Sequence, residues 1–138
     1  MGMRLRFRVD EAGAQTRWVV TGRFQGFRDV LHGGLVLALC DDAMWYAAFG
    51  RGGLTMTAEA TVRYRGPVQV GTAVLVRGWV TAQRGRLWTC AAELTPADGG
   101  AVLATAQGKF LPAPPETLGR RIAESRVHEF PEEEPGVQ

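Results

Sequence analysis

Several residue types are missing or rare in this chain. Its 138 residues include no asparagine, only one serine (Ser125) and only two histidines (His32 and His128). A nucleophilic serine needs a histidine base beside it, and Ser125 lies near the carboxyl terminus, beyond the patterned part of the chain. Hydrolysis by a Ser/His/Asp triad is therefore excluded on the body of the fold.

The chain also lacks long apolar runs and a large charge excess. Sixteen basic residues face 14 acidic ones, for a formal net charge of +2. The longest apolar stretch, residues 35–40, is far shorter than the roughly 20 residues that cross a bilayer. Arginines interrupt the first apolar positions, so no signal peptide is predicted. We expect a soluble, cytoplasmic protein that binds neither membranes nor nucleic acid.

Cysteine and histidine are too few to suggest a metal site. Cys40 and Cys90 each lie in an apolar run, which favours two buried thiols over a disulfide. His32 has only His128 as a possible partner, so no metal cluster is predicted. The glycines at 50–53 lack the ending of a phosphate-binding loop. We therefore expect no metal and no organic cofactor.

Apolar residues recur with two periods. Alternation typical of strands predicts strands over residues 4–10, 16–24, 55–65, 73–83, 87–95 and 102–111. In the third strand, residues 56, 58, 60, 62 and 64 are expected on one face. One helix is predicted over residues 33–49, and it is apolar nearly all round. These elements predict an α+β domain in which a long, curved antiparallel sheet of five to six strands wraps around one central apolar helix.

The same patterns predict domain organisation and assembly. Residues 1–112 form the predicted domain, and residues 113–138 form an extension with a short helix over 116–125 and an acidic, disordered end. One helix covers only one face of such a sheet, whereas several strands carry apolar residues on both faces. We therefore expect a homodimer, with a homotetramer as the alternative.

Two features of the predicted helix indicate a catalytic site. Asp41 and Asp42 lie among apolar neighbours, with no basic partner on their own helix. Unpaired carboxylates are costly in such surroundings and are often functional, unless they reach solvent at a gap or pair with an arginine from elsewhere. His32, Gly33 and Gly34 begin the helix, where open N–H groups and the helix dipole suit a carbonyl oxygen that becomes an oxyanion.

These motifs resemble a known family. The stretch from Phe24 to Met44, which holds the His-Gly-Gly turn and both aspartates, resembles the hotdog-fold acyl-CoA thioesterases of the PaaI-like, phenylacetate-pathway type. The resemblance continues through residues 62–68, Gly71, residues 84–86 and residues 98–108. It covers roughly residues 17–111 and implies the hotdog fold, acyl-CoA as substrate, and thioester hydrolysis.

The resemblance also implies roles for single residues. The Gly33 N–H polarises the thioester carbonyl, and Asp41 is the general base for water or the attacking nucleophile. His32 orients the substrate or the glycine-rich turn, and Thr57 positions the water. Asp42 stays a second candidate carboxylate. The carboxylate and the glycine turn of one site usually come from different subunits in this family.

Some features leave alternatives open. One branch of the family has an asparagine six positions before the histidine, where this chain has Gly26. Gly34 is a candidate substrate contact. Four arginines either meet the phosphates of coenzyme A or are solvated: Arg63, Arg65, Arg84 and Arg86. Two other functions on the same fold stay open for this chain: a non-catalytic module that binds acyl-CoA or another apolar ligand, and a hydratase or dehydratase. A hydratase usually needs a histidine within this helix, and none follows His32.

Overall fold

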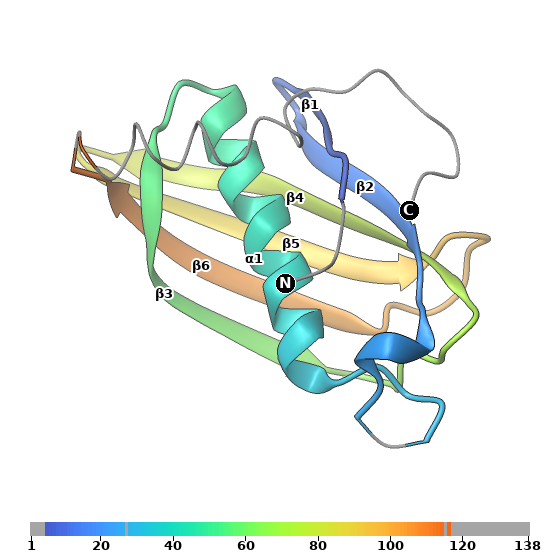
Figure 1. Cartoon of the computed structure of the whole chain (residues 1–138). Coiled ribbons are helices and arrows are strands. Elements are labelled where there is room, and N and C mark those ends of the chain that lie inside the picture. The colour runs from blue at the N-terminus through green and yellow to red at the C-terminus, as the bar shows by residue number, and fades with distance from the viewer. Residues whose placement is uncertain (1–4, 27, 115, 117–138) are drawn as a thin grey trace.

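The computed structural model describes residues 5–26, 28–114 and 116 (Figure 1). The helices and strands are β1 (Arg8–Asp10), β2 (Gly13–Val19), the short 3-10 helix η1 (Gly22–Phe24), α1 (Gly33–Gly50), β3 (Thr55–Tyr64), β4 (Ala73–Arg84), β5 (Leu87–Pro96) and β6 (Ala104–Pro112). The helix predicted over residues 116–125 and the acidic end lie, apart from residue 116, outside the described residues.

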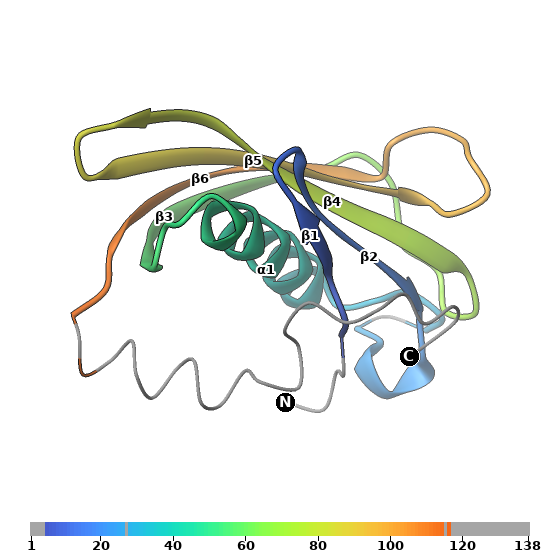
Figure 2. The same cartoon turned by 90° about the horizontal axis from the view of Figure 1, so that it is seen from above.

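All six strands belong to one antiparallel sheet in the order β1-β2-β4-β5-β6-β3. Figure 2 shows the sheet curving over α1, which lies along its inner face. This arrangement confirms the predicted α+β fold with one helix wrapped by a curved sheet. Within the described part of the chain, no helix combines the length and apolarity needed to span a membrane.

A row of small residues lets the helix lie close to the sheet. Ala14, Gly78, Ala92 and Ala106 pair in register across β2, β4, β5 and β6, and all four are buried. At Gly78 the approach is closest, since a Cβ atom there would lie 2.5 Å from the carbonyl carbon and oxygen of Ala43. The backbone of α1 therefore rests directly on the backbone of β4.

The amino-terminal segment packs on the helix as well. Leu5 and Phe7 are buried, whereas Arg6 and Arg8 are exposed, as the alternation predicts. The ring of Phe7 stacks on that of Tyr46 in α1, with 4.8 Å between centroids. Contacts from both the sheet and this segment explain why the helix is apolar nearly all round.

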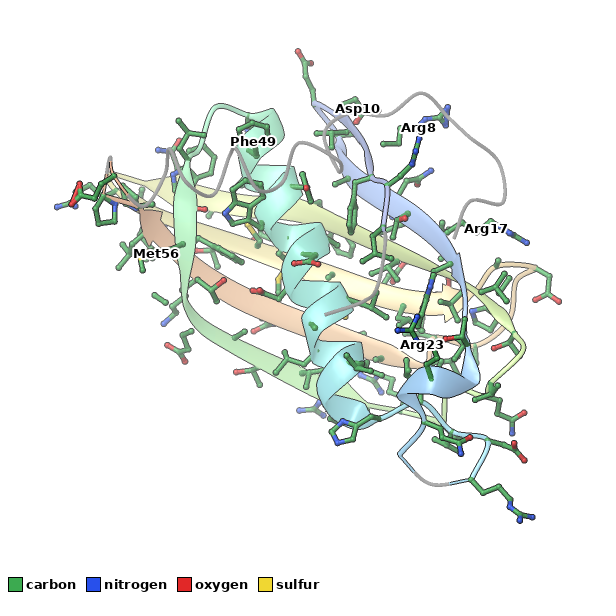
Figure 3. All side chains as sticks on the ribbon, in the orientation of Figure 1. Arg8, Asp10, Arg17, Arg23, Phe49 and Met56 are labelled. Atoms are coloured by element: carbon green, nitrogen blue, oxygen red, sulfur yellow. The ribbon has the colours of Figure 1, made fainter. Side chains whose placement is uncertain are left out.

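Three predictions about strands need correction. The first strand begins at Arg8, so residues 5–7 precede it instead of belonging to it. The second strand ends at Val19, and residues 22–24 form η1 instead of continuing it. In β3, the even-numbered residues from 56 to 64 do not all share one face as predicted, because the pairing with β6 shifts by one residue immediately after Thr57. This bulge places Thr57, opposite the buried Phe110, on the inner face, while Met56 is 43% exposed (Figure 3).

We predict that Gly78→Ala lowers the free energy of unfolding by about 2–3 kcal/mol, because the new Cβ overlaps backbone atoms of α1 that cannot move separately. Gly66→Ala is the matched control, since its Cβ meets only the flexible Leu103 side chain, at 3.3 Å. It should cost less than about 1 kcal/mol. Urea unfolding measures both, and equal losses would contradict the proposed helix contact.

Candidate active site

Three candidate residues form the start of α1, and we call them the first cluster: His32, Gly33 and Gly34. His32 is the N-cap residue, with extended backbone (φ −60°, ψ 134°), and its Nδ1 accepts a hydrogen bond of 2.8 Å from the Gly34 N–H. The imidazole thus does what a serine or aspartate side chain does at most helix starts. The Gly33 N–H donates to no group among the described residues, so the first turn of α1 retains an open donor.

A tight loop sets the position of this helix start. The Gly26 N–H donates to the Val30 carbonyl at 2.7 Å, and the Leu31 N–H donates to the Val68 carbonyl at 2.8 Å. A Cβ at Gly26 would lie 3.2 Å from Cα of His32. The position where one branch of the family has asparagine therefore packs against His32, and an asparagine here requires a small shift of that residue.

The second cluster consists of Asp41 and Thr57, and it joins α1 to β3. Asp41 is half-buried in the middle of the helix, and the Thr57 hydroxyl donates to its Oδ1 at 2.8 Å. The bulge in β3 turns Thr57 toward the helix. Asp42 is also half-buried, but it lies about 100° further around the helix axis and so faces away from Thr57. The structure thus brings together Asp41 and Thr57, two of the predicted site residues.

A thiol lies next to Asp41 but is a poor nucleophile. Burial raises the pKa of the Cys40 thiol from its ordinary value of 9.0 to about 12, and the charge of Asp41 adds to the rise. Burial also raises the pKa of Cys90 to about 11, against an opposing effect of Arg51. Both cysteines are buried and free, as predicted. Because only thiolates attack efficiently, Asp41 is the stronger candidate for the reacting group.

The two clusters lie apart within one chain. Gly33 and Asp41 are eight residues apart along a continuous helix, which separates their backbones by about 12 Å. Donors to one carbonyl oxygen need to lie within about 3 Å of it. The structure therefore does not bring the predicted oxyanion donor and the predicted base of the same chain to one reacting group.

The predicted arginines are spread over the surface, and all four are exposed. Arg65 follows β3 near the helix start. Arg84 and Arg86 flank Gly85 in the turn between β4 and β5, at the other end of the sheet. Arg63 pairs with Thr105 and lines a shallow hollow of about 310 Å³ on the outer face. They do not form one cluster in a single chain.

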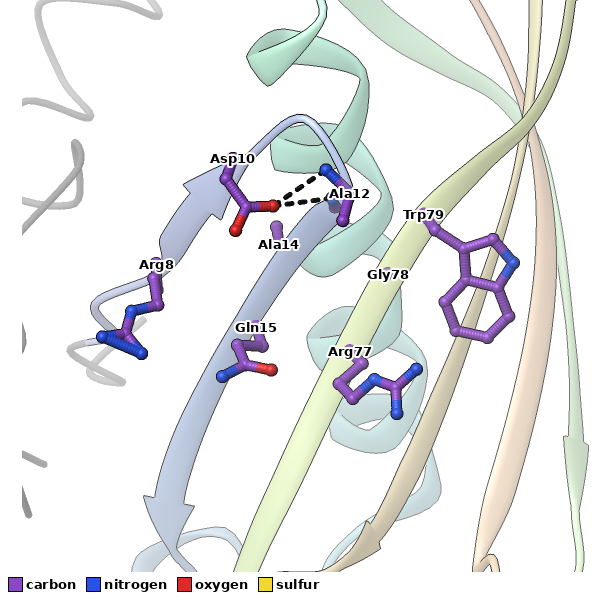
Figure 4. A pocket seen from close by; sticks show the side chains of 9 residues that line it. Arg8, Asp10, Ala12, Ala14, Gln15, Arg77, Gly78 and Trp79 are labelled. Carbon is purple, nitrogen blue, oxygen red and sulfur yellow. Dashed lines mark hydrogen bonds between the residues drawn. The ribbon is translucent and has the colours of Figure 1, made fainter.

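A larger hollow of about 500 Å³ lies on the outer face of β1, β2 and β4. Figure 4 shows Arg8, Gln15, Arg77 and Trp79 along it, with α1 behind the sheet. Arg77 already contacts Glu93 at 3.4 Å and lies 5.6 Å from the centre of the Trp79 ring. The sheet separates this hollow from both clusters.

One further residue, Tyr64, contacts the first cluster, although the sequence analysis did not propose it as a site residue. The Tyr64 hydroxyl, at the end of β3, donates to the Gly33 carbonyl at 2.7 Å. The two residues are 31 positions apart. Alternation placed Tyr64 on a strand face but contained no signal that linked it to the helix start.

A protein-family match covers the middle of the chain. A family model described as the thioesterase superfamily matches residues 29–103, which is more than half of the chain. The chain belongs to the thioesterase superfamily. Its match spans the His-Gly-Gly turn, both aspartates and most of the sheet. A search of curated protein sequences finds no significant match.

Solved structures of other proteins share the fold. PaaI of Escherichia coli, from the phenylacetic acid degradation operon, is 21% identical with a TM-score of 0.72, over 78% of this chain and 82% of PaaI. A substituted form of PaaI from Thermus thermophilus is 22% identical with a TM-score of 0.71, over 79% and 93% of the two chains. The protein smu.793 of Streptococcus mutans, solved with acetyl CoA bound, is 14% identical with a TM-score of 0.74, over 80% and 90%. The hotdog fold and the PaaI-like resemblance of this superfamily member are confirmed.

We predict a pH effect from Cys40. Above pH 9.0 the unfolded chain releases the Cys40 proton, whereas the folded chain keeps it up to about pH 12, so the thiol lowers stability as the pH rises. Between pH 8 and pH 10, the free energy of unfolding of the wild type should fall by about 1.4 kcal/mol more than that of Cys40→Ala. Urea unfolding under reducing conditions tests this, and an equal pH dependence of both proteins would be inconsistent with it.

Proposed function

We propose that this protein hydrolyses acyl-CoA thioesters in a site built by two copies of the chain. The observation that carries the proposal is the half-buried Asp41 carboxylate, held by the Thr57 hydroxyl on a helix whose only other charged side chain is Asp42. Membership of the thioesterase superfamily supports it. The relative solved with acetyl CoA, and a hypothetical thioesterase of Streptococcus pneumoniae solved with coenzyme A, support a CoA thioester as the ligand.

In the proposed reaction, Asp41 acts on water or on the substrate itself. As a base, it takes a proton while the water oxygen bonds to the thioester carbon; the C–S bond then breaks and the proton passes to the leaving thiolate. As a nucleophile, its oxygen bonds to the thioester carbon while the C–S bond breaks, which releases the CoA thiolate and leaves an anhydride; water then opens the anhydride to the free acid and the Asp41 carboxylate, and the proton that the water loses passes to the thiolate. The Thr57 hydroxyl donates its hydrogen bond to Asp41, so its oxygen lone pairs can accept a hydrogen bond from the water.

The oxyanion donor is the Gly33 N–H of a second copy. The helix separates the two groups in one chain by about 12 Å, whereas a two-fold axis between antiparallel helices can place each Asp41 near the partner's helix start. The free edge of β3 offers a surface for this pairing, since among the described strands only β6 pairs with it. Three large apolar side chains are also exposed there or on the adjacent β6: Met56, Tyr64 and Leu111.

The remaining candidates have supporting roles in this proposal. The acyl group lies along the apolar helix at the subunit interface. His32 and Gly34 shape the carbonyl site. Arg65 near the helix start, and Arg84 and Arg86 at the other end of the sheet, are candidates for the CoA phosphates because opposite ends of two copies meet in such a dimer. Arg63, on the outer face, is the least suited of the four arginines.

We predict that Asp41→Asn lowers kcat/KM by about 10²–10⁴-fold, because amide nitrogen and oxygen can neither accept the proton nor attack. Asp42→Asn is the matched control and should stay within about threefold of the wild type. Release of free thiol from a panel of aliphatic and aromatic acyl-CoAs measures both. Undiminished turnover by Asp41→Asn would contradict the assignment of the base.

A mixing experiment tests the two-copy site. Gly33→Pro removes the N–H and adds a ring at the first helical position, where proline fits, and His32 already has the extended backbone that a following proline requires. Gly33→Ala keeps the N–H, and its Cβ makes ordinary contacts of 3.4–3.5 Å with Tyr64. It should stay active, while Gly33→Pro and Asp41→Asn should each be inactive.

When these two inactive variants are refolded together, half of the dimers are mixed, and each mixed dimer holds one site with neither defect. We therefore expect activity to return to about a quarter of that of the wild type. No recovery in demonstrably mixed dimers would mean that each chain forms its own site. Ligand binding without hydrolysis by any form would favour the alternative, a non-catalytic acyl-CoA or apolar-ligand module.

A further inference from the structure

Tyr64 connects the end of the edge strand to the start of the helix. Its hydroxyl donates to the Gly33 carbonyl at 2.7 Å, although the side chain is 51% exposed and water could satisfy it. The ring also lies against Gly33, where an added Cβ would lie 3.5 Å from two ring carbons. Pairing of Tyr64 with Ala104 in β6 holds it in this position.

The hydrogen bond continues through one peptide group. The Gly33 carbonyl and the Gly34 N–H are the two ends of the same planar peptide. While the carbonyl accepts from Tyr64, the N–H donates to His32 Nδ1 at 2.8 Å. Each bond polarises the peptide in the direction that strengthens the other. Tyr64, the Gly33–Gly34 peptide and His32 thus form a continuous hydrogen-bond chain.

This chain determines which nitrogen of His32 carries the proton. A backbone N–H can only donate, so Nδ1 must present its lone pair, and the proton of the neutral imidazole lies on Nε2. Gly34 and Gly26 flank the residue, with added Cβ atoms that would lie 3.1 Å from Nδ1 and 3.6 Å from Cδ2. The exposed imidazole therefore offers an Nε2–H donor on the residue that directly precedes the open Gly33 N–H.

We propose that Tyr64 is a positioning residue of the site: acting through the Gly33–Gly34 peptide, it keeps His32 in the Nε2–H form, which then serves as the second donor to the thioester oxygen. This inference rests on the proposed thioesterase function. Tyr64 itself does not touch the substrate. Its hydroxyl orients the peptide that in turn fixes the imidazole, so its loss should lower turnover more than substrate binding.

The test uses Tyr64→Phe, which keeps the ring against Gly33 and removes only the hydroxyl. In the His128→Gln background His32 is the only histidine, so the ¹⁵N shifts of its ring report the tautomer directly. We expect the Nε2–H form alone with Tyr64 present, and a mixture of both tautomers in Tyr64→Phe. We also expect kcat to fall by about tenfold while KM changes by less than about twofold.

Tyr46→Phe is the matched control, because Tyr46 is the only other tyrosine and lies in the core against Phe7. It should leave the His32 tautomer unchanged. An unchanged tautomer in Tyr64→Phe overturns the inference whatever happens to kcat, and a shifted tautomer with unchanged kcat overturns the positioning role. If the wild type hydrolyses no acyl-CoA, the proposed function fails along with the role of Tyr64 in it, while the NMR result still decides whether the hydrogen-bond chain exists.

Discussion

The contact between α1 and β4 at Gly78 determines the position of everything else in this fold. Because no side chain separates the two backbones there, the helix lies as deep in the curved sheet as a helix can. The alanines that pair in register with Gly78 keep this depth across β2, β5 and β6. A helix held at that depth brings Asp41 within hydrogen-bond distance of Thr57 and the helix start within reach of Tyr64.

The same rigid helix also keeps the Gly33 N–H and the Asp41 carboxylate of one chain apart. It carries the open Gly33 N–H at its first turn and the carboxylate two turns further on, and no bend can bring them together without breaking the helix. The proposed dimer would solve this problem by symmetry, since two antiparallel helices present opposite ends to each other. In that proposal assembly and activity share one surface, and the free edge of β3 is part of both.

Much of the fold could be predicted from the chain, because burial leaves a periodic trace. The apolar helix over residues 33–49, the alternation of Leu5 and Phe7 and the short connections between β4, β5 and β6 required no tertiary information. Two details of the strands left no such trace. A bulge adds one residue without changing composition, so the alternation over residues 56–64 predicts a continuous strand in β3 and puts Met56 on the wrong face. The sequence also does not mark the end of β2 at Val19, since the residues that follow are compatible with a strand.

The candidates of the site could be named from the residues alone. Aspartates in an apolar helix and glycines at its start are anomalies of composition, and they are visible without coordinates because they oppose local propensity and burial. Which of these candidates meet depends on the tertiary structure. Thr57 reaches Asp41 through a strand bulge, Tyr64 reaches Gly33 across 31 residues, and Gly33 and Asp41 of one chain stay apart. The physical reason is that a hydrogen bond depends on distances of a few ångströms between segments remote in sequence, and these follow from packing depth and strand register.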